Sequence, residues 1–155
     1  MAERSIVHGV FAVDRKYKAS PAKAFKAWAD PELKRQWFGS PEPGNMKHSF
    51  DFRVGGVEHS EGKGPDNGDY VFDVRYYDIV PDNRIVYAYD MLLNGERISV
   101  SVATVEFKPD GSGTHMIVTE HGAFLDGLDT SDQRHAGTEW IMDQLGAFLD
   151  KQAAN

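Results

Sequence analysis

The stretch Thr130–Lys151, TSDQRHAGTEWIMDQLGAFLDK, decides how the rest of the chain has to fold. Thr130 can cap a helix, and Gln133 three residues later completes a capping-box pattern. The apolar residues that follow recur at the spacing of one helical face: Ile141, Leu145, Phe148 and Leu149. A helix of about 20 residues is about 30 Å long and cannot bury such a face alone. The stretch therefore predicts a long helix on a surface supplied by the preceding residues. This helix either covers a filled core or forms one wall of a cavity.

The composition is that of one ordinary globular domain. The chain has 155 residues, of which 41% are hydrophobic and 26% are charged. Its net charge of −7 argues against nucleic acid or an anionic membrane as a partner, and no window is apolar enough for membrane insertion. The N-terminus MAERSIVHGV lacks a signal-peptide core, so we expect a cytoplasmic protein. Because there are no cysteines, disulfides, thiolate metal sites and cysteine nucleophiles are excluded.

Most residues before the long helix are predicted to form strands separated by turns. In the first strand, Ser5–Lys18, alternation turns Phe11, Val13 and Tyr17 inward, together with Arg15, which would then need a partner. Six further strands are predicted: Met46–Arg53, Val57–Lys63, Asp69–Ile79, Arg84–Leu93, Ile98–Lys108 and Thr114–His121. We expect the following segment, 122–129, to be an apolar loop that packs onto the domain.

Two short helices are predicted after the first strand. Ser20-Pro21 and Asp30-Pro31 each place a capping residue before a proline. The second helix is expected to carry Leu33 and Trp37 and to stop at Gly39. The order of elements predicts one α+β domain over residues 1–155. In it, a strongly curved seven-stranded antiparallel sheet wraps a long C-terminal helix.

This order, with these residues in place, resembles the START-like (Bet v-type, SRPBCC) superfamily. More narrowly, the chain resembles the family homologous to the C-terminal domain of the heat-shock protein ninety ATPase activator. The matching stretches are YKASPAKAFKAWADPELKRQWFG (17–39), FDFRVGG (50–56), GDYVFDVRYYDIVPDNRIVYAY (68–89) and VEFKPDGSGTHMIVTEHGAF (105–124). The resemblance implies a helix-grip fold with an internal pocket for a small hydrophobic or amphipathic ligand.

Large side chains on the inner faces are candidates for lining that pocket, although each could equally belong to a solid core. The candidates are Trp37, Phe50, Phe52, Tyr70, Phe72, Tyr87, Tyr89, Met116, Phe124, Trp140 and Ile141. Gly137 is a further candidate. Glycine inside a helix is about 1 kcal/mol less favourable than alanine, so a role in packing or in access to the pocket is expected for it. We expect the mouth between the loop 124–128 and the helix start, with Trp37 and Trp140 near the ligand. The alternative is that Gly137 only permits close helix–sheet contact.

Glu120 is the candidate catalytic residue, because it continues the alternation of Met116 and Val118 onto the concave face. A buried carboxyl group has a raised pKa unless it is paired, which suits acid–base chemistry. The alternatives are a structural Arg15–Glu120 pair or an exposed strand end.

The sequence contains no motif for a metal or a cofactor. The six histidines have no metal-ligand spacing, and no phosphate loop or nucleophile turn is present, so we expect neither kind of group. His8 and His115 are expected on the solvent side.

Three functions remain open. The chain could bind a small hydrophobic or amphipathic ligand in a stress or resistance response. It could be a cyclase- or dehydratase-type enzyme acting on a polyketide-like or other apolar molecule, or a chaperone-helper interaction module. The eukaryotic activator has a separate N-terminal domain that contacts the chaperone. This chain has no room for that domain, so a chaperone partner is not expected. A homodimer is possible.

Overall fold

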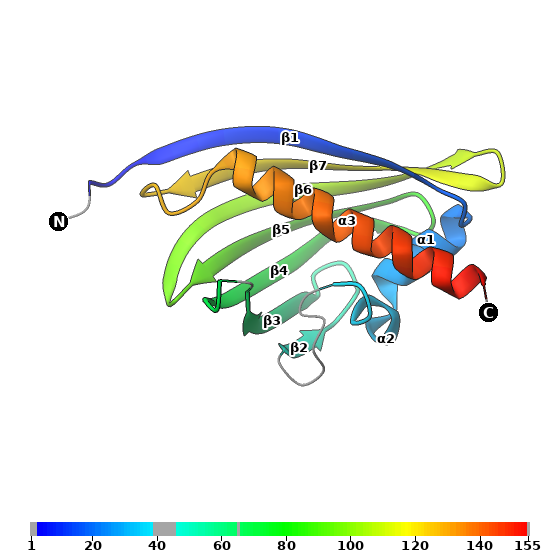
Figure 1. The fold of residues 1–155 in the computed structure, drawn as a ribbon, viewed down its shortest axis with the longest axis horizontal. Coiled ribbons are helices and arrows are strands. Elements are labelled where there is room, and N and C mark those ends of the chain that lie inside the picture. Colours follow the sequence, from blue (N-terminus) through cyan, green and yellow to red (C-terminus); the bar gives the residue numbers. More distant parts are fainter. Residues whose placement is uncertain (1–2, 39–45, 65, 155) are drawn as a thin grey trace.

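The computed structural model describes residues 3–38, 46–64 and 66–154 and has the predicted order of elements (Figure 1). The strands are β1 (Ile6–Tyr17), β2 (Met46–Phe50), β3 (Val57–Lys63), β4 (Asp69–Val80), β5 (Arg84–Leu93), β6 (Glu96–Asp110) and β7 (Gly113–Leu125). The helices are α1 (Pro21–Ala29), α2 (Pro31–Lys34) and α3 (Ser131–Ala153). The α+β fold class is therefore confirmed.

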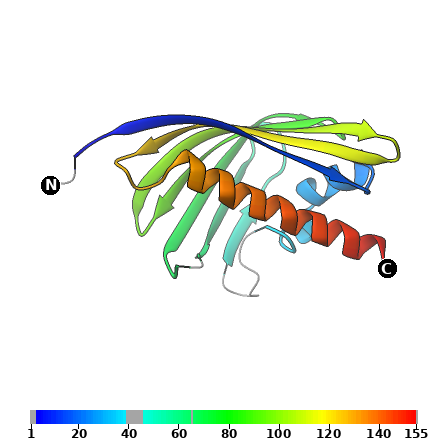
Figure 2. The ribbon, with the colours of Figure 1, turned by 45° about the horizontal axis from the view of Figure 1, so that its top comes forward.

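All seven strands form one antiparallel sheet in the order β1-β7-β6-β5-β4-β3-β2. The chain meanders from β2 to β7, and β1 pairs with β7 along its whole length. At the β5–β6 hairpin, Asn94 and Gly95 both have positive φ, the backbone conformation that a two-residue turn of this kind requires. Figures 1 and 2 show the strands curving around one side, on which α3 lies, with α1 and α2 at one end.

Helix α3 begins as the capping pattern predicts, because the Thr130 hydroxyl accepts a hydrogen bond from the Gln133 backbone N–H at 3.1 Å. Its buried side chains recur every three or four residues: Arg134, Thr138, Met142, Leu145 and Leu149. Its first turn lies close to β1, since a Cβ on Gly9 would be only 2.4 Å from Ser131 Oγ. Further along, the Tyr17 hydroxyl donates a hydrogen bond to the Met142 carbonyl at 2.7 Å. The helix is therefore held along β1, at one edge of the sheet.

The core lies between the concave face and the helices, as the alternation predicts. Phe11 and Val13 of β1 are buried, as are Ile85 of β5 and Val118 of β7. The indole of Trp37 is buried against α1 and donates a hydrogen bond to the Ala27 carbonyl at 3.0 Å. No helix among the described residues is long and apolar enough to cross a membrane.

Three predicted boundaries were wrong. Helix α2 ends at Lys34, and Trp37 lies in the turn that follows, where its indole reaches back to α1. The predicted stop at Gly39 lies outside the described residues. Strand β2 ends at Phe50, so Phe52 lies beyond it. The predicted loop 122–129 is strand as far as Leu125, because the first half of β1 supplies its backbone partners.

Candidate functional site

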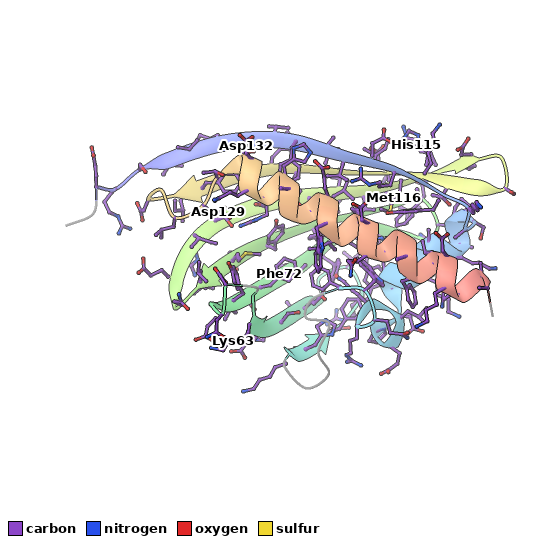
Figure 3. The ribbon with its side chains drawn as sticks, viewed as in Figure 1. Lys63, Phe72, His115, Met116, Asp129 and Asp132 are labelled. Carbon is purple, nitrogen blue, oxygen red and sulfur yellow. The ribbon has the colours of Figure 1, made fainter. Side chains whose placement is uncertain are left out.

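The concave face gathers most of the residues predicted to line a pocket. Buried there are Tyr87, Tyr89, Met116, Glu120 and Phe124, whereas Trp37 is buried beside α1. Half-buried are Phe50, Phe52, Tyr70, Phe72 and Ile141. Figure 3 labels Phe72 and Met116 among the side chains between the sheet and α3, and Asp129 at the start of the helix. Most of these positions follow from strand alternation alone.

Two predicted residues lie on the other side of α3, so the placements of Trp140 near the ligand and of Gly137 at the opening were wrong. Trp140 is 53% exposed, and a Cβ on Gly137 would meet no atom within 4 Å. Trp140 follows the buried Thr138 by two residues, which is about 200° around a helix. Gly137 therefore neither opens a pocket nor permits a close helix–sheet contact.

The predicted mouth is occupied by the side chain of Arg134. Its Nη2 donates hydrogen bonds to Asp129 Oδ2 at 2.7 Å and to Ser99 Oγ at 2.8 Å. The guanidinium lies 5.5 Å from the centre of the Phe124 ring, which is itself buried. Arg134 thus closes the space between the end of β7 and the first turns of α3.

Glu120 is buried on the same face and joined to Arg134 through a tyrosine. The Tyr89 hydroxyl donates to Glu120 Oε1 at 2.5 Å, and Tyr89 in turn accepts from Arg134 Nη1 at 2.9 Å. Thr138 Oγ1 lies 3.5 Å from Glu120 Oε2, but it is only 2.9 Å from the Arg134 carbonyl, to which it donates. Both the Arg15–Glu120 pair and the exposed strand end were therefore wrong. Arg15 instead bonds to Asp143 at 2.9 Å on the outer part of α3.

Burial raises the pKa of the Glu120 carboxyl above its ordinary value. The hydrogen bond from Tyr89, the charge of Arg134 and the Thr138 hydroxyl offset only part of that shift. Burial also raises the pKa of Tyr89, so the phenol keeps its proton and remains the donor to Glu120. A carboxyl of this kind can exchange a proton nearer neutral pH than an exposed glutamate can.

A second buried polar cluster, which the sequence did not predict, lies at the other end of the concave face. Lys34 Nζ bonds to Glu58 Oε1 at 2.7 Å, His48 Nε2 lies 2.7 Å from Glu58 Oε2, and the Tyr76 hydroxyl donates to Oε1 at 2.5 Å. The Lys34 ammonium also lies 4.8 Å from the centre of the Phe38 ring. Every polar group of the cluster therefore has a partner, and together they fix α2 to the sheet.

The pKa of Glu58 moves in the opposite direction to that of Glu120. Burial alone would raise it, but the charge of Lys34 and hydrogen bonds from His48, Lys34 and Tyr76 outweigh burial and lower the pKa to about 2. Glu58 is therefore a fixed anion with structural partners, whereas Glu120 has no cation in direct contact within the part of the chain that the structure describes. The sequence signal for the cluster is weak, since Lys34 and His48 read as ordinary polar residues.

Among the hollows of the described surface are two of about 480 and 300 Å³. The first lies beside Arg4, Ile6 and Asp126, and the second lies on the outer face, beside Val10 and Val102. Neither lies between α3 and the sheet, so the enclosed cavity remains a prediction. Within residues 3–38, 46–64 and 66–154, no three His, Cys, Asp or Glu side chains are gathered as a metal site requires.

The fold is similar to solved structures over nearly the whole chain. A putative uncharacterized protein from Rhizobium leguminosarum is 41% identical, with a TM-score of 0.90 over 96% of this chain and 99% of its own. Mll3558 from Rhizobium loti is 39% identical, with a TM-score of 0.86 over 93% of this chain and 99% of its own. SA2116 from Staphylococcus aureus, 18% identical, shares the fold with a TM-score of 0.75, covering 97% of this chain and 98% of its own.

A comparison with curated proteins gave no match. The family model described as "Activator of Hsp90 ATPase homolog 1-like protein" matches residues 18–150, which is most of the chain. Because this model matches most of the chain and the chain has the START-like fold, the chain belongs to the family of Activator of Hsp90 ATPase homolog 1-like proteins.

Proposed function

We propose that the chain binds a small hydrophobic or amphipathic ligand between the concave face and α3. The observation that carries this proposal is the Arg134–Tyr89–Glu120 network, buried where the helix meets the sheet. Burying an arginine and a glutamate is costly, and well-packed apolar side chains often stabilise such a position better. A few polar groups inside an otherwise apolar surface are instead typical of ligand sites, where they orient the ligand.

The apolar part of the proposed site is a set of side chains that pack on the core but are only partly buried. They are Phe38, Phe50, Phe52, Phe72, Met91, Ile141 and Phe148. Phe72 contacts Tyr89, with ring centres 4.7 Å apart, so this apolar surface adjoins the polar network directly. A ligand with an apolar body and one polar end could cover the first and contact the second.

A titration with the apolar fluorophore N-phenyl-1-naphthylamine tests this proposal. We expect saturable binding near one equivalent and a rise in melting temperature, since a ligand that binds only the native state stabilises it. Phe72→Gln should weaken binding at least about fivefold, because it replaces apolar contact with a polar amide. Tyr77→Gln is the matched control, because Tyr77 lies on the same strand but is 57% exposed. Equal affinities for the two variants, or no binding by wild type, would contradict the proposal.

An enzyme is the second candidate, favoured by the raised pKa of Glu120 and its 2.5 Å hydrogen bond from Tyr89. Glu120 would then transfer a proton to or from a bound apolar molecule. Glu120→Gln removes the proton-transferring group but keeps the shape. Turnover of any identified substrate should fall at least about a hundredfold, the usual range for losing a general acid or base. Undiminished turnover would assign the chemistry to another residue.

A further inference from the structure

The charges around Glu120 do not balance when its carboxyl is ionised. Arg134 is the only cation of the described network, and its charge is already met by Asp129, whose carboxylate lies 2.7 Å from Nη2 and is itself mostly buried. Glu120 is 4% exposed and has no Lys or Arg in direct contact among the described residues. An ionised Glu120 therefore leaves one negative charge without a counterion in the interior, a costly state unless something neutralises it.

The hydrogen bonds point to the atom where the neutralising group would bind. Glu120 Oε1 already accepts the Tyr89 proton at 2.5 Å. Among the described residues, the only hydrogen-bond partner of Oε2 is Thr138 Oγ1 at the long distance of 3.5 Å, and the Arg134 carbonyl, at 2.9 Å, is the nearer acceptor for the single hydroxyl proton of Thr138. Oε2 is thus a buried acceptor without a good donor. It can either carry a proton itself or accept one from a ligand.

We propose that the ligand's polar end is a protonated amine that donates a hydrogen bond to Glu120 Oε2. This inference rests on the proposed function and specifies its chemical class: a cationic amphiphile. The ammonium supplies a positive charge beside the Glu120 carboxylate and a hydrogen-bond donor to Oε2. The neighbouring rings of Phe72 and Tyr89 add aromatic surface, which attracts cations more than anions.

An anionic polar end does not fit this arrangement. It would face Glu120, and the protons of Arg134 Nη2 are already directed at Asp129 and Ser99, with Nη1 bonded to Tyr89. A fatty acid would therefore be repelled by Glu120, and only the second Nη1 proton and the Nε proton of the guanidinium would be left to bind it. A neutral alcohol could donate to Oε2, but it would leave the negative charge uncompensated. The order of affinity should thus be amine, then alcohol, then carboxylate.

Binding of decylamine, decanol and decanoate, each below its micelle concentration, tests the inference by calorimetry. We expect wild type to bind decylamine at least about tenfold more tightly than decanol, as a charge-assisted hydrogen bond predicts. Glu120→Gln should remove that preference, so that decylamine and decanol bind this variant within about twofold of each other. Gln can accept from Tyr89 and donate to Thr138, so this variant should fold. Glu106→Gln is the control, because it makes the same charge change on the half-buried outer face of β6.

Amine binding should also release a proton. A bound ammonium favours the ionised form of Glu120, so the carboxyl gives up its proton to solvent where it held one. The other titratable or charged groups nearby are Tyr87, Tyr89, Asp129 and Arg134. Calorimetry of decylamine in two buffers with different ionisation enthalpies measures this release. It should fall to near zero in Glu120→Gln.

The outcomes separate the inference from the proposed function. If decanol or decanoate binds as tightly as decylamine, or if Glu120→Gln keeps the amine preference, the inference is wrong while ligand binding stands. If none of the three binds to wild type, the proposed function itself fails. If decylamine is preferred, the preference depends on Glu120 and a proton is released, the amine class is supported.

Discussion

At the scale of single residues, two buried glutamates, Glu58 and Glu120, have different surroundings and so respond oppositely to pH. The pKa of Glu58 is lowered from 4.5 to about 2, mainly by Lys34 acting against burial. The pKa of Glu120 is raised, because burial outweighs Tyr89 and the more distant Arg134. The difference lies in a direct lysine contact at 2.7 Å, which Glu120 does not have. One glutamate therefore stabilises the fold as an anion, and the other does so only when neutral.

Replacing each glutamate by glutamine should give opposite pH dependences of stability. Glu58→Gln should cost about 3 kcal/mol at pH 7, because a pKa lowered from 4.5 to about 2 stabilises the fold with the carboxylate ionised. Because the folded pKa is depressed, that loss should shrink as pH falls from about 4.5 towards 2. The pKa of Glu120 in the folded state is raised, so ionisation of Glu120 lowers the free energy of unfolding of wild type as pH rises above about 4.5. Glu120→Gln should therefore become relatively more stable with rising pH.

Urea denaturation of wild type and both variants between pH 3 and 8 measures these differences. Taking each variant against wild type at the same pH removes the titration of all other groups. Parallel curves for the two variants would contradict the assignment of opposite pKa shifts.

Part of this site could be predicted from the sequence, and the rest could not. Strand alternation placed Glu120 and Tyr89 on the concave face, because side chains on a strand have only two directions. Arg134 was missed, since a charged residue in the first turn of an amphipathic helix is ordinarily solvated. Its burial depends on Asp129 and Ser99, which come from a loop and a distant strand. The meeting of these three residues depends on how the loop, β6 and α3 pack together, which the sequence pattern does not show.

At the scale of elements, the position of α3 depends on the close approach of its first turn to β1. Gly9 faces Ser131, and an added Cβ would lie 2.5 Å from Ser131 Cβ as well as 2.4 Å from its hydroxyl oxygen. Because the Ser131 side chain is short and its backbone is held in the helix, it cannot rotate away from a Cβ at position 9, and the helix or β1 would have to shift. Arg134 follows Ser131 by three residues, so a displaced first turn would also loosen the polar network.

Gly9→Ala should therefore destabilise the fold by about 1–3 kcal/mol, as overpacking usually does. Adding Ser131→Gly removes the opposing side chain and should restore part of that loss. Gly137→Ala is the matched control on the same helix, where an added Cβ meets nothing. It should stabilise the protein by up to about 1 kcal/mol, because alanine is the better helix former. Thermal unfolding of wild type, Gly9→Ala, Ser131→Gly, their double variant and Gly137→Ala tests this; purely additive effects of Gly9→Ala and Ser131→Gly would contradict the contact.

At the scale of the whole molecule, the order and pairing of the elements follow from the regular spacing of strands and turns in the sequence, whereas the packing of the interior does not. Short turns between strands force neighbours to pair, which makes β2 to β7 a meander. Curvature and the height of α3 above the sheet depend on many side chains at once, so the size of any cavity could not be predicted. The homodimer and the absence of a chaperone partner both stay predictions.

The last prediction concerns where in the molecule a ligand makes its contacts. The outer hollow of about 300 Å³ involves only β1, β6 and β7, whereas the proposed site also involves α3, β4 and β5. In native-state hydrogen exchange of the free protein, amides of the inner strands β3 to β7 should exchange more slowly than those of the edge strands, because each inner strand has paired neighbours on both sides. The five-residue edge strand β2 should exchange much faster.

Decylamine should then slow exchange in the first half of α3, around Arg134 and Thr138, and in β4 and β5, around Phe72 and Tyr89. These elements carry the residues that the ligand would contact, and binding stabilises local structure at its contacts as well as globally. Comparing wild type with Glu120→Gln at the same decylamine concentration separates specific binding from general effects of the amphiphile. Slowing confined to β1, β6 and β7 would place the ligand at the outer hollow instead, and the concave face would then have to be regarded as a filled core.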